Sequence, residues 1–240
     1  LYNKECYIAS ALNSVLNQTF QDFEVIVVDD GPNDAGASVV RSFGDPRIRL
    51  LQGDNQGVSA ARNRGIEVAG SDLIAFLDAD DEWLPSFIET IRRLRASYPD
   101  AGLYGTAYEV HFPGTIVKRI YNKYEGERLL SSYFGSLVEF NSVLIYPSTS
   151  AVPKEILKSV GGFPLGVKWN EDGTLWGKIA LQYPVAYSPK VCSIYNKYTA
   201  NNSSAIREYL DEPFIQYIST LSKDELLSLS YIDDLMEYCD

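Results

Sequence analysis

Apolar and polar residues follow a helical period at the start of the chain and then change to a strand pattern. Ile8, Leu12 and Val15 fall on one stripe, which predicts a core-facing helix within residues 4–18. Residues 23–28, with the sequence FEVIVV, form a short apolar run rich in β-branched residues. Such a run is typical of a strand that is buried on both faces.

The same two patterns alternate as far as residue 97. Helices are predicted at 35–43, 58–69 and 84–97, and strands at 47–51 and 73–77. This β-α-β-α-β order with short connections predicts a mostly parallel, Rossmann-like sheet with helices packed against it. Ligands of such sheets bind at the carboxyl ends of the strands.

Beyond residue 97 the pattern favours a smaller antiparallel part. Residues 102–112 and 115–121 flank Pro113-Gly114 and predict a hairpin. The remaining segments predict helices near 126–138, 153–159, 172–182 and 212–238, and a strand at 184–195.

Composition and charge narrow the function classes. The 240 residues are 45% hydrophobic and 22% charged, which indicates one ordinary globular domain. The formal net charge of −11 disfavours nucleic acid as a partner, because phosphate repels an acidic surface. The longest charge-free run, residues 6–21, is too short and too polar to span a bilayer, although peripheral association with a membrane stays open.

The three cysteines indicate a cellular compartment, and the single histidine excludes one class of metal site. The cysteines are scattered without a CxxC pair, which favours a reducing compartment and hence the cytoplasm, including the inner face of its membrane. One histidine cannot build a multi-histidine zinc site. His111 lies in an alternating segment, YEVHFPG, and is expected to be an ordinary strand residue.

The strongest chemical signal is FLDADDEWLP, residues 76–85, directly after a predicted strand. Its clustered carboxylates repel one another, and an oxygen-preferring divalent cation relieves that repulsion. Asp78 and Asp80 are therefore candidate ligands for Mn²⁺ or Mg²⁺, which could in turn hold a diphosphate. The alternative is a solvated turn that leads into a helix with an acidic first turn.

Two other segments end near the same edge of the predicted sheet. Asp30 follows the strand at 23–28 and could accept hydrogen bonds from a base or ribose, or from loop amides instead. Arg62 lies on the helix at 58–69 and could stack on a base or pair with phosphate, or be a plain surface cation. The chain lacks both GxGxxG and GxxxxGK, so neither a dinucleotide fold nor a P-loop is supported.

Together these segments resemble a known enzyme family. Their order and spacing over residues 1–100 are similar to the nucleotide-sugar half of inverting family 2 glycosyltransferases, which have the GT-A fold. Residues 161–189 resemble the acceptor-side segment of that family, in which a Glu-Asp pair opens a helix. The strand that precedes this region in the family is absent, so the resemblance implies a chain that lacks its first strand. The motifs that carry the resemblance are LYNKECYIASALNSVLNQTFQDFEVIVVDDG, NQGVSAARNRGI, DLIAFLDADDEWLP and GGFPLGVKWNEDGTLWGKIALQYPVAYSP.

The resemblance implies roles on the donor side of the site. Tyr2 would border the nucleotide base, Asp30 would bind the uracil or ribose, and Arg62 would help to hold the base. Asp78 and Asp80 would form the DxD motif, with Asp80 as the direct ligand of Mn²⁺ or Mg²⁺ and Asp78 nearer the ribose.

On the acceptor side, Asp172 would be the general base, with Glu171 beside it. Trp169 and Trp176 bracket this pair, and either could stack on a sugar, although the helical position of Trp176 favours the core. The alternative for Asp172 and Glu171 is an acidic first turn of a helix.

The resemblance implies a single GT-A domain with two halves. Residues 1–100 would bind the nucleotide-diphosphate sugar, residues 101–200 would bind the acceptor, and residues 201–240 would form an acidic helical extension. The expected activity is inverting transfer of one hexosyl or N-acetylhexosaminyl group, with UDP favoured as the nucleotide, to a hydroxyl of a glycan, lipid-linked or small acceptor. A non-catalytic nucleotide-sugar-binding or scaffold module of the same fold is the alternative.

Overall fold

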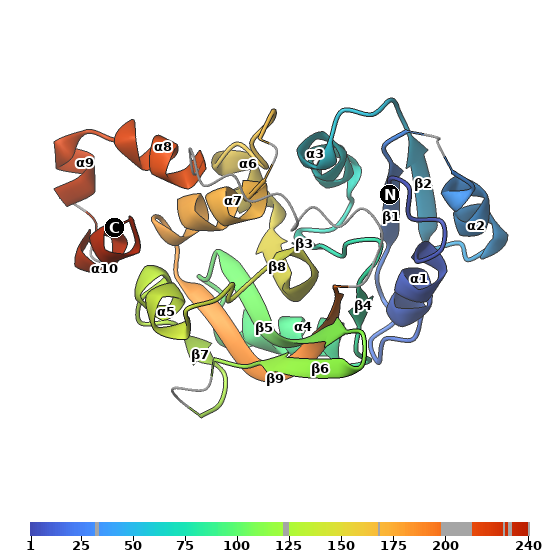
Figure 1. The fold of residues 1–240 in the computed structure, drawn as a ribbon, viewed down its shortest axis with the longest axis horizontal. Helices are drawn as coiled ribbons and strands as arrows, with labels where there is room; N and C mark the ends of the chain where they lie inside the picture. Colours follow the sequence, from blue (N-terminus) through green and yellow to red (C-terminus); the bar gives the residue numbers. More distant parts are fainter. Residues whose placement is uncertain are drawn as a thin grey trace.

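The computed structural model describes residues 1–31, 34–121, 125–167, 169–197, 213–227, 229 and 232–239. Within these ranges the chain forms a two-stranded sheet and a seven-stranded sheet, with helices packed on both (Figure 1). The α/β class expected from the sequence is therefore confirmed.

The N-terminal part alternates helices and strands as its periodicity predicts. The stripe of Ile8, Leu12 and Val15 is buried, and Ile8 and Leu12 pack in one cluster with Val27 and Val40. The two strands of this part pair in parallel. The elements are α1 (Ile8–Leu16), β1 (Val25–Asp29), α2 (Gly36–Ser42), β2 (Ile48–Gln52) and α3 (Val58–Val68).

The seven-stranded sheet forms the centre of the molecule. Its strand order is β3-β8-β5-β9-β4, with β6 added to β5 and β7 added to β9. These strands are β3 (Leu73–Ala75), β4 (Glu82–Trp83), β5 (Leu103–Phe112), β6 (Thr115–Arg119), β7 (Arg128–Leu129), β8 (Ser150–Pro153) and β9 (Val185–Asn196).

The sheet is mixed, which corrects the expectation of a mostly parallel one. Among the strands described, β1·β2 and β5·β9 pair in parallel, and the other five pairings are antiparallel. β3 pairs antiparallel with β8, a four-residue strand that the sequence pattern does not reveal. The apolar pattern of a strand fixes which faces are buried, but it does not identify the neighbouring strand.

The predicted hairpin around Pro113-Gly114 is confirmed, because β5 and β6 pair from Phe112↔Thr115 onward. His111 lies on β5, as expected, with a ring nitrogen 3.1 Å from Glu109. The helix predicted at 126–138 is partly wrong, since Arg128–Leu129 form β7. The helix begins only at Tyr133, where the preceding Ser132 hydroxyl caps its first turn.

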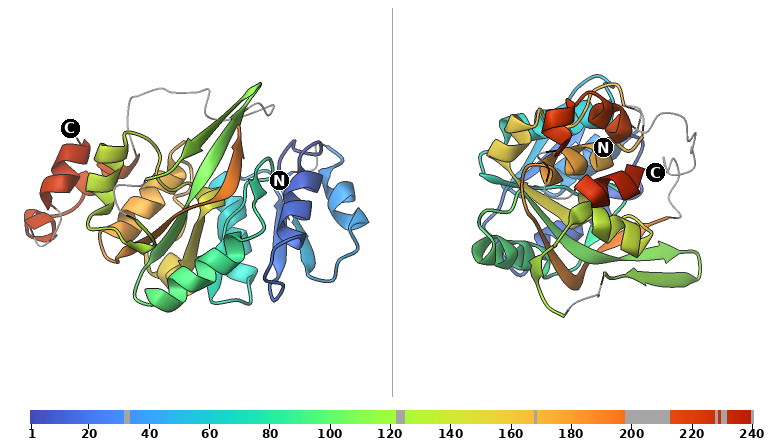
Figure 2. Two further views of the ribbon diagram at one scale, coloured as in Figure 1. Left: turned by 90° about the horizontal axis from the view of Figure 1, so that it is seen from below. Right: turned by 90° about the vertical axis from the view of Figure 1, so that its left-hand side faces the viewer.

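Helices cover the sheet and extend the molecule at its C-terminal end, away from the N-terminal part (Figures 1 and 2). Trp176 is fully buried with Phe76 and Phe163, which confirms its expected place in the core. No helix in the described ranges combines the length and apolarity needed to cross a bilayer. The helices are α4 (Phe87–Ser97), α5 (Tyr133–Phe140), η1 (Pro147–Thr149, a 3₁₀ turn), α6 (Lys154–Ser159), α7 (Glu171–Ala180), α8 (Pro213–Ser219), α9 (Lys223–Leu227) and α10 (Ile232–Cys239).

Candidate active site

A cavity of about 1670 Å³ is lined by residues of β1, of β3 and the loop after it, and of the start of α7. It brings together the candidate donor-side, metal and acceptor-side residues, which come from both halves of the chain. Eight of the residues that line it are candidate site residues from the sequence: Tyr2, Asp30, Arg62, Asp78, Asp80, Trp169, Glu171 and Asp172.

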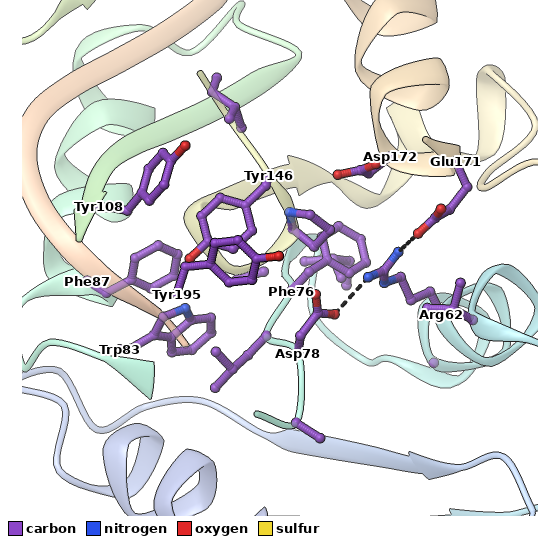
Figure 3. Close-up of a pocket in the computed structure, with 18 of the residues that line it drawn as sticks. Arg62, Phe76, Asp78, Trp83, Phe87, Tyr108, Tyr146, Glu171, Asp172 and Tyr195 are labelled. Carbon is purple, nitrogen blue, oxygen red and sulfur yellow. Dashed lines mark hydrogen bonds and ion pairs between the residues drawn. The ribbon is translucent and has the colours of Figure 1, made fainter. Parts of the chain in front are cut away.

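Arg62 connects the two acidic segments of the site. Its guanidinium donates to Asp78 Oδ1 and to Glu171 Oε1, each at 2.7 Å, and only 13% of its side chain is exposed (Figure 3). The guanidinium also lies 5.0 Å from the centre of the Phe163 ring. Burial alone would lower the pKa of Arg62, but Asp78 and Glu171 outweigh burial and raise it. Arg62 therefore joins carboxylates that lie 93 residues apart in the sequence (171 − 78).

Asp80 lies on the loop after β3 and faces the N-terminal segment. Lys4 donates to Asp80 Oδ2 at 2.7 Å, and both side chains are largely buried. Asp78 is more open, with 37% of its side chain exposed toward the cavity. Both carboxylates are therefore ion-paired and line the cavity, and Asp78 is the more exposed of the two.

Asp81, the third carboxylate of this loop, is a buried anchor. Its oxygens accept from the Ser148 hydroxyl at 2.7 Å and from the Asn196 backbone N–H at 3.0 Å. Ser148 Oγ also accepts from the backbone of Asp78, while the Asn196 side chain donates to the Asp80 carbonyl. Burial, followed by the charge of Asp78, raises the pKa of Asp81 well above its usual range. Ser148 and Asn196 thus fix the loop that carries Asp78 and Asp80.

Removing the Ser148 hydroxyl is expected to weaken this anchor. Ser148→Ala takes one donor from a buried carboxylate, so we expect the free energy of unfolding to fall by about 1–3 kcal/mol. Ser193→Ala is the matched control, because the buried Ser193 hydroxyl donates to the Ser148 carbonyl and not to the acidic loop. That control should lose only about 1 kcal/mol in urea unfolding. Equal losses in both variants would contradict the anchoring role.

Asp172 and Glu171 occupy the first turn of α7, where the helix dipole favours negative charge. Asn170 precedes them in the left-handed conformation, with φ at 55°. Its side chain fills the space where a Cβ on residue 173 would project, which explains Gly173 in the first turn. Burial, and next the charge of Glu171, raise the pKa of Asp172 to about 6 despite the opposing effect of Arg62. Asp172 can therefore exchange a proton near neutral pH.

Asp30 and Tyr2 also line the cavity. Both Asp30 carboxylate oxygens accept backbone hydrogen bonds, from Gln56 at 3.0 Å and Gly57 at 2.8 Å. This matches the loop interpretation, although a carboxylate has further acceptor capacity for a ligand. The Asp30 amide donates to the Leu1 carbonyl at 2.9 Å, which places the neighbouring Tyr2, 40% exposed, at the cavity edge.

Three tyrosines that the sequence did not single out form a further wall of the cavity (Figure 3). The Tyr146 ring centre lies 4.8 Å from that of Tyr108 and 5.1 Å from that of Tyr195. They come from β5, β9 and the residue before η1, segments without a common motif. The pairing of β5 with β9, and the packing of η1 against both strands, bring them together, so no local signal in the sequence could have found them.

The carboxylates on the β3 loop fit a divalent cation that a ligand helps to hold. No group of three or more His, Cys, Asp or Glu side chains among the described residues forms a ready-made metal cage. Mg²⁺ and similar ions commonly use one or two protein carboxylates together with substrate phosphate oxygens. Asp78 and Asp80 supply that set, and a cation at Asp80 would compete with Lys4.

Comparisons with known proteins identify the fold and the family. A crystal structure of S. aureus TarS 1-349 in complex with UDP-GlcNAc superposes with a TM-score of 0.76 at 21% identity, covering 95% of this chain and 65% of that one. The mannosyltransferase PcManGT from Pyrobaculum calidifontis, in complex with GDP-Man and Mn²⁺, gives a TM-score of 0.64 at 20% identity, covering 85% of this chain and 57% of that one. At these identities the likeness shows the GT-A fold alone.

Sequence relatives extend the comparison. The putative glycosyltransferase EpsH of Bacillus subtilis is 36% identical over 116 residues, which make up 48% of this chain and 34% of EpsH. An uncharacterized glycosyltransferase of Nostoc sp. is 28% identical over 214 residues, 84% of this chain and 64% of the relative. The chain thus spans between one third and two thirds of their lengths. The model of the family "Glycosyl transferase family 2" matches residues 1–161, starting at the first residue, so the match lends no support to a missing first strand. The chain belongs to glycosyl transferase family 2.

Proposed function

We propose that this protein transfers one hexosyl or N-acetylhexosaminyl group from a nucleotide-diphosphate sugar to an acceptor hydroxyl, with inversion at the anomeric carbon. The observation that carries the proposal is the pairing of Arg62 with both Asp78 and Glu171, because it sets the acidic β3 loop opposite Asp172 in one cavity. Residues 1–100 then supply the donor side and residues 101–200 the acceptor side of a single domain.

Names of relatives support uridine as the base of the donor. A transferase of Escherichia coli, 35% identical over 48% of this chain and 46% of its own length, is named UDP-Glc:alpha-D-GlcNAc-diphosphoundecaprenol beta-1,3-glucosyltransferase WfgD. TarS has been crystallised with UDP-GlcNAc. Tyr2 and Asp30 border the part of the cavity where we place the base and ribose.

The proposed reaction is a single displacement. Asp172 takes the proton of the acceptor hydroxyl while the hydroxyl oxygen forms a bond to the anomeric carbon. The bond from that carbon to the diphosphate oxygen breaks, and its electron pair leaves with the diphosphate. Glu171 already accepts from Arg62, so we assign it the orientation of that arginine, while Trp169 lines the acceptor side. Mn²⁺ or Mg²⁺ at Asp80 and Asp78 would stabilise the charge that develops on the leaving diphosphate.

Isothermal titration of UDP, GDP, CDP and dTDP, with and without Mn²⁺, tests the donor side. We expect UDP to bind in a Mn²⁺-dependent manner and Asp80→Ala to weaken binding by about tenfold or more, since a ligand of the cation is lost. Asp100→Ala, which removes an exposed carboxylate outside the cavity, is the control.

Two other results would change the proposal. Unchanged binding by Asp80→Ala would remove Asp80 from the metal site. Tight UDP binding without sugar transfer to any of a broad acceptor panel would favour the alternative, a non-catalytic nucleotide-sugar-binding module.

A further inference from the structure

The tyrosine wall continues onto one face of the β5–β6 hairpin. Residues that pair directly across strands share a face of the sheet, so Arg119 lies on the same face as Tyr108, and Tyr195 on the same face as Val110. Because side chains alternate along β5, Tyr108 and Val110 share one face, and all four residues line the cavity. Lys197, which follows β9, lines it as well.

Arg119 and Lys197 differ from the other cations of the cavity. Lys4, Arg62 and Arg95 form ion pairs with carboxylates, and Arg92 lies over the ring of Phe20. No carboxylate within the described ranges pairs with Arg119 or Lys197; Lys197 lies 5.5 Å from the centre of the Tyr195 ring.

The absence of a carboxylate partner for Arg119 among the described residues is unexpected in so acidic a chain. Acidic residues outnumber basic ones by 32 to 21, yet the half-buried Arg119 lies opposite Tyr108 and not opposite a carboxylate. The Tyr108 hydroxyl donates to the Val143 carbonyl at 2.7 Å and is not available as an anion. A guanidinium in a partly desolvated cavity gains most from an anion that accepts two hydrogen bonds, as a phosphate does.

We propose that Arg119 forms a subsite for a phosphate group carried by the acceptor, and that Lys197, on the other side of β5 in the same cavity, adds positive charge. This inference rests on the proposed function, because it places the acceptor between Asp172 and the hairpin. Phosphate can reach the subsite from two sources, a sugar linked through diphosphate to a lipid or a phosphodiester-linked polyol chain. Phe112 and Val143, 38% and 54% exposed, line the cavity near this subsite and offer an apolar contact to the lipid form.

The chain supplies a matched pair of variants for the test. Arg119→Gln removes the proposed contact, whereas Lys118→Gln removes the neighbouring charge. Lys118 is 63% exposed and pairs with Glu109 at 3.6 Å, on the opposite face of the hairpin. Arg119→Lys retains the charge but loses the planar fork of donors.

The probes are a short-chain alkyl diphosphate sugar, a phosphodiester-linked polyol oligomer and the neutral methyl glycoside of the same sugar. Binding of each is measured by titration, with and without UDP and Mn²⁺. We expect at least one phosphate-bearing probe to bind more tightly than the glycoside, and Arg119→Gln to weaken its binding about tenfold. Lys118→Gln should change nothing, Arg119→Lys should restore part of the affinity, and Lys197→Gln should give a smaller loss.

The possible outcomes separate this inference from the proposed function. Equal affinity for the glycoside and the phosphate probes, or equal effects of Arg119→Gln and Lys118→Gln, overturns the subsite. A loss of UDP affinity in Arg119→Gln also overturns it and assigns Arg119 to the donor. If UDP fails to bind the wild-type protein, the proposed function fails, while the probe titrations without UDP still decide whether Arg119 binds phosphate.

Discussion

Asp172→Asn is expected to lower kcat for sugar transfer by about 10³-fold, within the range that a general base contributes. The amide retains the size of the carboxylate but cannot take the acceptor proton. The affinity for UDP should stay within about twofold of the wild type, since the role proposed for Asp172 is toward the acceptor and not toward the nucleotide. Steady-state release of UDP and titration of UDP measure the two effects separately.

The pH dependence provides a second measurement of the same role. Burial and Glu171 raise the pKa of Asp172 to about 6, so the wild-type rate should increase through pH 6 as Asp172 loses its proton, and then level off. Glu171→Gln removes a neighbouring negative charge, which lowers the pKa of Asp172 and moves the inflection to lower pH. Full kcat in Asp172→Asn, or an inflection that Glu171→Gln leaves in place, would remove Asp172 from the proposed mechanism.

The sequence predicts those parts of the fold whose signals are local. The stripe of Ile8, Leu12 and Val15 and the turn at Pro113-Gly114 specify their helix and hairpin without help from the rest of the chain. Strand pairing is not local. The segment Leu73–Ala75 looks like the next parallel strand, but it pairs with Ser150–Pro153, which is too short to show a periodicity.

The same division applies to the site. Carboxylates that directly follow an apolar strand or open a helix, such as Asp78 and Asp172, can be found by inspection of the sequence. Their connections cannot, because Arg62 meets Glu171 across 109 positions and Asn196 meets Asp81 across 115. Such contacts depend on how the elements pack, and the sequence around a polar residue does not identify its distant partner.

Arg62→Met is expected to have the largest effect on stability of any single change in the site. Arg62 is the shared partner of Asp78 and Glu171, and only 12% of the Glu171 side chain is exposed. Removal of one partner from a buried ion pair costs about 3–5 kcal/mol, because the other charges stay in the cavity uncompensated. The exposure of Asp78 favours the lower end of that range. Urea unfolding at pH 7.5 measures the loss.

Control variants and pH separate this charge effect from simple loss of packing. Arg64→Met, on the same helix, removes an exposed side chain that donates to the Gln52 carbonyl, and should cost under about 1 kcal/mol.

The native pKa of Asp172 lies above its usual value, so its ionisation destabilises the fold as pH rises from about 4 through 6. Without Arg62 that pKa rises further, so the deficit of Arg62→Met should shrink at pH 5, where protonation relieves the repulsion. Glu171→Gln in the same chain should recover part of the deficit at pH 7.5. A deficit that is equal at both pH values, or matched by Arg64→Met, would show that Arg62 acts by packing and not as the charge that unites the two halves of the site.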